Sequence, residues 1–544
     1  MRSTMQDVPL SISRLLLHGT TVHRDSTVQT WTGEGLRTAT YGEVGARAGR
    51  LAGALRGLGV DGDQRVGTFM WNNQEHLEAY LAVPSMGAVL HTLNIRLFPE
   101  QVTYIANHAQ DKVVICDGSL VELLAGVVEG FETVDHVVVT GDADWSALEG
   151  KGVELHRYDE LLAAADERFD WPEVDERDAA AMCYTSGTTG NPKGVVYSHR
   201  SMTLHSMGAA MGDAMGLTPS DKVLAIVPQF HAMSWGIPYA AMMVGASLVM
   251  PDRFLAPEPL LAMMRESRPT FSGAVPTIWQ GILAVLDADE SRAEDIASLE
   301  EVVVGGSACP ESLMRAFEDR FGVRIIHAWG MTETSPLGSV ARPPVGAEGE
   351  DAWAYRVTQG RFMSQVESRL IGDDGSELPK DGEAVGELEC RGPWITGAYH
   401  LDDDPDKFDG GWLRTGDVGR ISPDGFLTLT DRSKDVIKSG GEWISSVELE
   451  NAIMAHPAVV EAVVVGIPDE KWGERPLASV VVKDGQDVSA DELKEFLADK
   501  VAKWQLPDKW AFIDEVPKTS VGKFDKKVIR QRFADEELEV VTAA

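Results

Sequence analysis

This chain has few cysteines, no long apolar run and no excess of positive charge. No C-x-x-C pair occurs, and the cysteines lie far apart, at Cys116, Cys183, Cys309 and Cys390. This spacing argues against a disulfide framework or a zinc site held by cysteines, and favours reduced thiols in a cytosol. No apolar run reaches the roughly 18 residues that span a bilayer, and the first twenty residues lack a signal-peptide core. We therefore expect a cytoplasmic protein that is not integral to a membrane.

The charge balance is strongly acidic, with a formal net charge of -36 over 544 residues. Such a field repels phosphate backbones and anionic lipid, which argues against nucleic acid or an anionic membrane as a partner. We attribute the acidity to solubility or a salty habitat rather than to function. With 44% hydrophobic residues, the chain is globular and too long for one compact core, which predicts at least two domains.

Hydrophobic periodicity predicts an α/β protein. Short apolar strands alternate with helical segments over most of the chain, which indicates parallel sheets covered by helices. After Arg361 the pattern changes to short alternating strands and turns, a small β subdomain. A charged boundary at 431–435 precedes a last α+β region with expected helices at 447–455 and 490–501. We predict an N-terminal domain at 1–430, a connection at 431–436 and a C-terminal domain at 437–544, with the acidic patch 536–539 in a solvated tail.

One stretch is dense in glycine and hydroxyl residues. Residues 184–194 read YTSGTTGNPKG and lie between two apolar runs, which predicts a loop joining two strands. Glycines let successive N–H groups converge on an anion, hydroxyls donate further bonds and Lys193 adds positive charge. The stretch is not a Walker A loop, because Pro192 stands where its second glycine would be and Gly194 follows Lys193. A plain Ser/Thr/Gly-rich surface turn is the alternative.

The full string resembles the phosphate-binding signature of the adenylate-forming superfamily, which comprises acyl-CoA synthetases, luciferases and peptide-synthetase adenylation domains. The resemblance covers about residues 13–527 and is closest to bacterial long-chain and medium-chain fatty acyl-CoA synthetases. It implies that this loop binds the phosphates of ATP through Thr185, Ser186, Gly187, Thr188, Thr189, Gly190 and Lys193. It also implies an N-terminal ATP- and acyl-binding domain and a small mobile C-terminal cap.

Three more segments carry the resemblance. Two strands end in 305–308 and 327–334, where α/β proteins bind ligands. By resemblance, Gly306, His327, Ala328, Trp329 and Gly330 surround adenine and the acyl carbonyl, Thr332 contacts the α-phosphate, and Glu333 with Thr185 ligates Mg²⁺. Oxygen ligands suit that cation, although a helix N-terminal carboxylate is the plain alternative for Glu333. Asp417, an acceptor suited to a diol, and Arg432 are implied to bind ribose.

The C-terminal residues are implied to act in turn. The hinge of the family corresponds to Lys434, which we also count among the nucleotide contacts. In one orientation of the C-terminal cap, Lys523 reaches the α-phosphate. In the other orientation, Lys438 takes the place of Lys523, and Gly440, Gly441 and Trp443 lie near CoA. Without the resemblance, Lys523, a lysine that follows a glycine, would be interpreted as a solvated surface charge.

The chemistry fits two half-reactions. A carboxylate resists thiol attack, so it first forms acyl-AMP with release of pyrophosphate, and CoA then displaces AMP. Lys193, Lys523 and Mg²⁺ would offset the charge of two approaching anions. We expect ATP, CoA and a carboxylic acid as small-molecule partners, and leave a homodimer open. A non-catalytic nucleotide-binding regulator on the same fold is the alternative from another class.

The acid itself is less narrowly predicted. His231 stands where amino-acid-activating domains typically have an aspartate, which disfavours an amino acid. Ala232 and Trp235 follow in the same segment and are also predicted to contact the acyl group. By resemblance, Trp235 corresponds to an aromatic gate of some long-chain enzymes. The apolar run 237–250 could line an acyl site or could simply be a helix and a strand of the hydrophobic core. We predict a long- or medium-chain fatty acid, with a short, sulfur-containing or aryl acid as the alternative.

Overall fold

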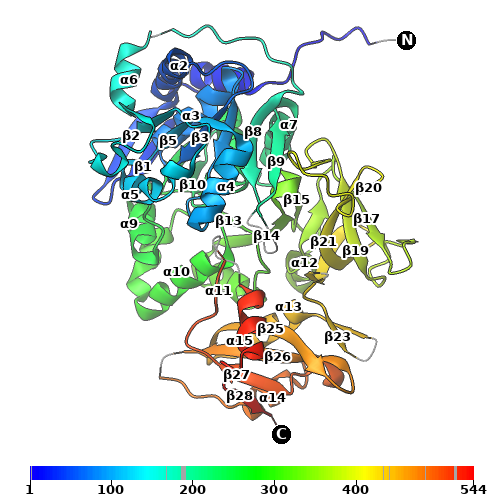
Figure 1. The fold of residues 1–544 in the computed structure, drawn as a ribbon. Coiled ribbons are helices and arrows are strands. Elements are labelled where there is room, and N and C mark those ends of the chain that lie inside the picture. The colour runs from blue at the N-terminus through cyan, green and yellow to red at the C-terminus, as the bar shows by residue number, and fades with distance from the viewer. Residues whose placement is uncertain are drawn as a thin grey trace.

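The computed structural model describes residues 1, 3–166, 168–185, 191–432, 434–439, 442–483, 485–519 and 524–543, with the side chains of residues 442 and 443 left out. Within this part of the chain, the strands form three sheets of seven, fifteen and six strands. Figure 1 shows the two large sheets with their helices above and the small C-terminal sheet below. This is the α/β architecture that the sequence predicts.

The seven-stranded sheet has the order β7-β6-β5-β3-β4-β8-β9 and is parallel except at β9. Its interior strands are apolar because helices cover both faces. Its strands are β3 (Arg65–Phe69), β4 (Val89–Thr92), β5 (Asp111–Cys116), β6 (His136–Val139), β7 (Glu154–Arg157), β8 (Ala179–Tyr184) and β9 (Gly194–Ser198). The intervening helices are α2 (Tyr41–Gly57), α3 (Gln74–Ser85), α4 (Pro99–Ala109), α5 (Val121–Ala125), α6 (Tyr158–Ala164) and α7 (His199–Ala210).

The first half of the fifteen-stranded sheet is a second parallel sheet, except for the antiparallel edge strand β2. This half contains β1 (Thr27–Trp31), β2 (Leu36–Thr40), β10 (Lys222–Ala225), β11 (Ser247–Met250), β12 (Phe271–Ala274), β13 (Glu301–Val304) and β14 (Arg324–Gly330). Its helices are α1 (Ile12–Val22), α8 (Ile237–Val244), α9 (Pro257–Ser267), α10 (Pro276–Ala288) and α11 (Glu311–Phe321). The run 237–250 is therefore a helix and a strand. Side chains of α1, α3 and α8 share one hydrophobic core with both large sheets.

Antiparallel strands continue this sheet beyond β14 and form the predicted β subdomain. The strands are β15 (Leu337–Val340), β16 (Gly360–Phe362), β17 (Glu367–Ile371), β18 (Glu377–Leu378), β19 (Gly386–Arg391), β20 (Phe408–Asp409), β21 (Trp412–Ile421) and β22 (Phe426–Arg432), with helix α12 (Gly349–Arg356). Because β22 ends at Arg432, it enters the segment predicted as the connection between domains.

The C-terminal sheet has the order β24-β23-β26-β27-β28, and β25 pairs with β26. Its strands are β23 (Ile437–Ser439), β24 (Glu442–Ile444), β25 (Val459–Asp469), β26 (Gly473–Val482), β27 (Lys509–Phe512) and β28 (Val540–Thr542), and its helices are α13 (Ser446–Met454), α14 (Ala490–Leu497) and α15 (Lys526–Ala534). Two expectations were wrong here. Helix α14 stops at Leu497, four residues early, and although the acidic patch 536–539 is mostly exposed as expected, the chain after it is no tail, because β28 pairs with β27.

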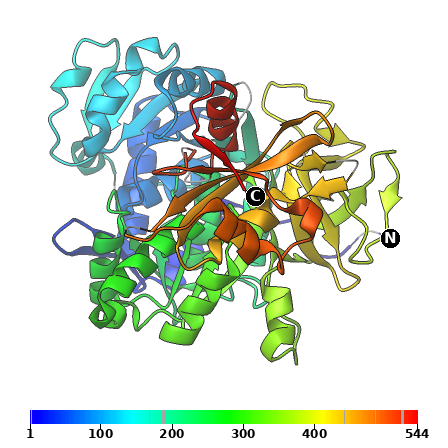
Figure 2. The ribbon, with the colours of Figure 1, turned by 90° about the horizontal axis from the view of Figure 1, so that it is seen from below.

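Buried polar groups attach the C-terminal sheet to β22. The Asp431 carboxylate accepts a hydrogen bond from the Ser446 amide at 2.8 Å. The Lys526 ammonium lies 4.0 Å from an Asp431 oxygen and also forms an ion pair with Glu450 at 2.9 Å, and all three side chains are largely buried. Seen from below, the orange and red C-terminal elements lie over the middle of the molecule, beside the yellow β subdomain (Figure 2).

Two further predictions concern the whole chain. All four cysteines are free and buried, in keeping with the reduced thiols that their spacing favours. Among the described residues, no helix has both the length and the apolar character needed to cross a bilayer.

Candidate active site

The carboxyl ends of strands from both large sheets meet in one place. After β3, the Asn72 side chain donates to the carbonyl oxygens of Ala225 and Val227, each at 2.7 Å, at the end of β10. The Tyr197 hydroxyl, on β9, donates to the Thr332 carbonyl just after β14, at 2.8 Å. The segments predicted to bind ATP follow β8 and β14, so these bonds hold them next to each other.

The two ends of the predicted phosphate loop are bonded together. Thr185 donates its amide to the Lys193 carbonyl at 2.9 Å, and the Lys193 amide donates to Thr185 Oγ1 at 3.1 Å. This pair closes the hairpin between β8 and β9. Ser186, Gly187, Thr188, Thr189 and Gly190, on which the predicted phosphate cradle depends, lie outside the described residues.

Lys193 is surrounded by acidic groups. Its ammonium lies 2.5 Å from an Asp404 oxygen and 3.5 Å from an Asp402 oxygen, and 5.0 Å from the ring centre of Tyr399. The hydrogen bond with Asp404 raises the pKa of Lys193, so this lysine is fully charged at neutral pH. A bond from the His400 amide to the Gly194 carbonyl, at 2.8 Å, holds the acidic segment beside the loop.

Glu333 lies in the short 3₁₀ helix η6 (Thr332–Thr334) and is only 5% exposed. The Tyr399 hydroxyl donates to one of its carboxylate oxygens at 2.6 Å. Tyr399 therefore links Glu333 to Lys193 and, through the closed hairpin, to Thr185. A carboxylate and a hydroxyl are the oxygen donors that a hard divalent cation takes, so this donor set fits Mg²⁺.

The predicted ribose-binding carboxylate is preorganised. Asp417, on β21, is 3% exposed, and it accepts a bond from the Trp329 indole nitrogen at 2.8 Å. Its other oxygen lies 3.0 Å from the Arg432 guanidinium at the end of β22. The charge of Asp417, supplemented by that of Glu333, raises the pKa of Arg432. Lys434 is exposed, just beyond this cluster.

The remaining nucleotide candidates line the ends of β13 and β14. Gly306 has φ +83°, a conformation that favours glycine. A Cβ on Gly330 would lie 2.0 Å from the Pro336 carbonyl oxygen, so the close approach of these segments requires glycine. His327 and Ala328 are buried on β14, and burial lowers the pKa of His327 to about 4, so its imidazole is neutral at pH 7.

The predicted acyl-binding residues form a left-handed turn. Four consecutive residues, Ala232 to Trp235, have positive φ between 44° and 56° in the 3₁₀ segment η4 (Ala232–Gly236), directly after His231. Ser234 stabilises the turn from inside, donating to the Val227 carbonyl at 2.7 Å. The turn places the Trp235 indole 3.7 Å from a Cβ position on Gly273 and 3.4 Å from one on Gly305.

Among the residues that the cap is predicted to bring to the reaction, only Lys438 has a described side chain. Lys438 is exposed on β23, and its amide donates to Glu474 at 2.9 Å within the C-terminal sheet. Lys523, Gly440 and Gly441 lie outside the described residues, and Trp443 is described only by its backbone in β24. Their roles stay predictions.

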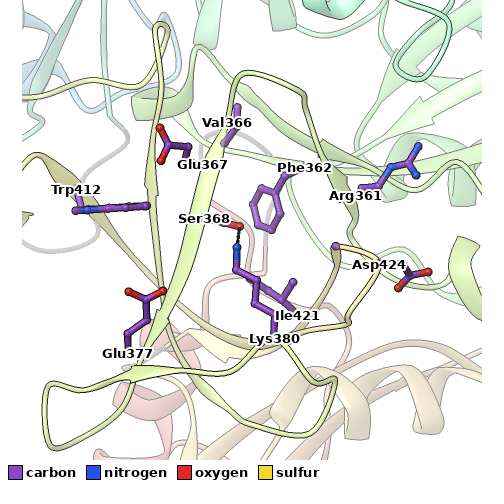
Figure 3. Close-up of a pocket in the computed structure, with 11 residues that line it drawn as sticks. Arg361, Phe362, Val366, Glu367, Ser368, Glu377, Lys380, Trp412, Ile421 and Asp424 are labelled. Atoms are coloured by element: carbon purple, nitrogen blue, oxygen red, sulfur yellow. Dashed lines mark hydrogen bonds between the residues drawn. The ribbon is translucent and has the colours of Figure 1, made fainter.

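A cavity of about 470 Å³ lies elsewhere, among β16, β17 and β21 (Figure 3). Charged and aromatic side chains line it, and Lys380 donates to the Ser368 hydroxyl at 3.3 Å. None of the residues predicted for the active site is among those that line it. The cavity is therefore separate from the predicted active site at the strand ends.

Sequence reasoning missed the residues that contact Lys193 and Glu333. Tyr399, Asp402 and Asp404 are more than 200 positions from Lys193 along the chain, and their partners are set by the fold. The run of three aspartates at 402–404 is a weak signal, because acidic runs are usually solvated surface.

Comparison with known proteins decides the family. The AMP-binding enzyme family matches residues 18–400, and the C-terminal domain of AMP-binding enzymes matches residues 448–523. The chain belongs to the AMP-binding enzyme family. It is 44% identical to a 3-methylmercaptopropionyl-CoA ligase of Ruegeria lacuscaerulensis, over 98% of this chain and 99% of that one. It is also 44% identical to a long-chain-fatty-acid–CoA ligase of Thermus thermophilus, over 98% and 97%.

A solved structure shares the whole fold. The crystal structure of an anthranilate CoA ligase with anthranoyl-AMP superimposes with a TM-score of 0.87 at 26% identity, over 98% of this chain and all of that one. This member of the AMP-binding enzyme family is thus an acid–thiol ligase, which uses ATP to activate a carboxylic acid and joins the acid to CoA. The non-catalytic alternative has no support among these relatives.

Proposed function

We propose that the acid is a medium- or long-chain fatty acid, and that Trp235 gates its binding site. The position of the Trp235 indole over Gly273 and Gly305 carries this proposal. Neither glycine has a Cβ that would hold the indole from its other side, although Ile237 also lies against Gly273, at 3.3 Å from the same Cβ position. A turn of Trp235 would therefore uncover the Gly305 side of this surface. The resemblance to gated long-chain enzymes and the 44% identity to a long-chain ligase support the same reading.

A short sulfur-containing acid is the second candidate. The equal identity to the 3-methylmercaptopropionyl-CoA ligase favours it. In that case the Trp235 indole would stay in place as a fixed floor, that is, as the closed end of the acyl site, and would admit only acids of a few atoms. Sequence identity cannot separate the two, since both relatives are equally similar.

The chain-length profile tests the proposal. Pyrophosphate release should be measured with saturated acids of two to eighteen carbons and with 3-methylmercaptopropionate, with aryl and amino acids as controls. A fatty-acid enzyme should have its highest kcat/KM at eight carbons or more. A maximum at the short acids, with longer chains gained only in Trp235→Ala, would overturn the gate and support the floor.

For the first half-reaction, we propose that Glu333 and Thr185 hold Mg²⁺ and that Lys193 and Lys523 bind phosphate oxygens. Bound there, the cation would neutralise triphosphate charge. Lys193 must exchange Asp404 and Asp402 for phosphate, while Asp417 and Arg432 hold the ribose and His327 to Gly330 enclose the adenine. The acyl carboxylate then faces the α-phosphate beside Thr332.

For the second half-reaction, we propose that the C-terminal domain turns about Lys434 and brings Lys438 in place of Lys523, with Gly440, Gly441 and Trp443 beside CoA. Lys523→Ala should abolish acyl-AMP formation and leave thioester formation from supplied acyl-AMP largely intact. Lys438→Ala should impair thioester formation more. Equal losses in both steps would contradict the alternation.

Two other expectations remain proposals. A homodimer would appear by light scattering as twice the chain mass of 59.1 kDa. A cytoplasmic location would place the protein in the cytosolic fraction of fractionated cells.

A further inference from the structure

Three side chains able to bind a metal lie together on the edge of the seven-stranded sheet, apart from the catalytic motifs. His136 begins β6, and Glu154 and His156 lie on β7, the edge strand. His136 pairs in register with Glu154, and Val138 with His156. Since alternate residues of a strand point to the same face, the register places all three side chains on one face of the sheet.

The distances between their ligand atoms suit one small ion. His136 Nδ1 lies 3.2 Å from His156 Nε2. Glu154 places one oxygen 3.6 Å from His136 Nδ1 and the other 3.8 Å from His156 Nε2. A tetrahedral ion bound at about 2.0–2.1 Å separates its ligand atoms by about 3.3–3.4 Å. The two imidazoles and the carboxylate would therefore reach such an ion with small side-chain movements.

Burial differs among the three groups in a way that suits a metal site. The imidazoles of His136 and His156 are 17% and 13% exposed, whereas the Glu154 carboxylate is 69% exposed. Burial thus restrains the two nitrogen ligands, and the carboxylate side faces the solvent from which an ion would enter. The nitrogens that face each other can share only one proton, so an ion between them would bond both at once.

We propose that His136, Glu154 and His156 form a site for a divalent transition metal of the zinc class. Two imidazoles and a carboxylate favour Zn²⁺, Co²⁺ or Ni²⁺ over Mg²⁺, which takes oxygen ligands. The ion would fasten the edge strand β7 to β6, with water completing its coordination.

This site would be structural rather than catalytic. It lies at the amino end of β6, whereas the predicted phosphate loop follows the carboxyl end of β8, four strands away. Four strand spacings alone are about 19 Å, too far for direct contact with the reacting groups.

Metal titration of the full chain tests the proposal. Chelator-treated protein, dialysed free of chelator and without ATP, should bind one Zn²⁺ with micromolar or tighter affinity by calorimetry, and Co²⁺ should give a visible absorption band typical of tetrahedral coordination. Glu154→Gln changes an exposed side chain and should preserve the fold, and it should weaken zinc binding about tenfold or more, as should His156→Gln.

The His18 and His23 pair supplies a matched control. Its ring centroids lie 5.1 Å apart, close to the 5.2 Å of His136 and His156. The double variant His18→Gln/His23→Gln should bind zinc like the wild type. Zinc affinity that is unchanged in Glu154→Gln and His156→Gln, or weaker than millimolar in the wild type, would overturn the proposal.

Thermal stability supplies a second readout. Zinc should raise the melting temperature of the wild type and of the control variant but not of His156→Gln, because only a folded site gains from the ion. Pyrophosphate release with Mg²⁺ should be the same in Glu154→Gln and the wild type. An equal rise in melting temperature in His156→Gln, or an activity loss in Glu154→Gln, would contradict a structural metal at this edge.

Discussion

The ribose side and the phosphate side of the active site are built differently. On the ribose side, the Asp417 side chain is 4% exposed and is bonded by Trp329 and Arg432. On the phosphate side, the Lys193, Asp404 and Asp402 side chains are 31%, 26% and 39% exposed. The ribose side is a preformed, buried acceptor. The phosphate side is a set of compensated charges, and in the proposed role Lys193 would exchange its aspartate partners for phosphate when ATP binds.

The comparison has an energetic consequence. Removing a buried acceptor such as Asp417 leaves its donors unsatisfied and costs about 1–3 kcal/mol, whereas exposed ion pairs are worth about 0–1 kcal/mol. Substitutions at buried acceptors should therefore have large effects, and those among the half-exposed charges should have small ones, some of them favourable.

The largest effect is expected at Glu333, which is buried although it belongs to the phosphate side. Glu333→Gln keeps an oxygen for Tyr399 but loses the charge that would hold Mg²⁺, so pyrophosphate release should fall about 10²- to 10³-fold. The Mg²⁺ dependence of the rate measures this loss. Glu367→Gln, at an exposed strand position, is the control. A variant that retains more than a tenth of the wild-type rate at every Mg²⁺ concentration would remove Glu333 from this role.

Asp417→Asn tests the ribose side. The amide can still accept from Trp329, but the charged acceptor proposed for the ribose hydroxyls is lost, so kcat/KM for ATP should fall about 100-fold. The ATP dependence of pyrophosphate release measures it. Asp409→Asn is the matched control, since Asp409 pairs with Arg369 on the same sheet at 2.9 Å and is 67% exposed. Equal effects of the two variants would contradict the contrast between the sides.

The buried His327 should make the stability of the protein depend on pH. Its folded pKa of about 4 lies below the ordinary value of 6.5, so the unfolded chain binds the proton first as the pH falls. The stability that it contributes is present above about pH 6.5 and lost below it, about 2 kcal/mol between pH 7 and 5. Denaturant unfolding should show a shallower decline with acid in His327→Gln. Identical slopes in variant and wild type would contradict a neutral buried imidazole.

The smallest effect is expected at Asp404. Asp404→Asn removes a competitor of the triphosphate for Lys193, so the KM for ATP should fall by a few fold, a change below about 1 kcal/mol. Steady-state kinetics measures it, with the exposed neighbour Asp403→Asn as the control. If the KM rises instead, Asp404 positions Lys193 for ATP rather than competing for it.

Local patterns predicted the α/β class because a strand buried on both faces must be apolar throughout. The same reasoning placed the hairpin between β8 and β9 from its glycines and hydroxyl residues. It failed at the end of the chain, where a short segment after an acidic patch pairs as β28. A strand that depends on one distant partner leaves little trace in its own residues.

Residue types and their order along the chain were enough to predict the family of this ligase, its two half-reactions and the groups proposed to bind ATP. They were enough because each of those groups lies in a short segment whose chemistry can be read without neighbours. Only the tertiary structure decided that Asp404 and Asp402 face Lys193, that Tyr399 reaches Glu333, and that His136 meets Glu154 and His156. These contacts join segments from different strands or distant loops, and their geometry exists only once the sheets have formed and fixed their register.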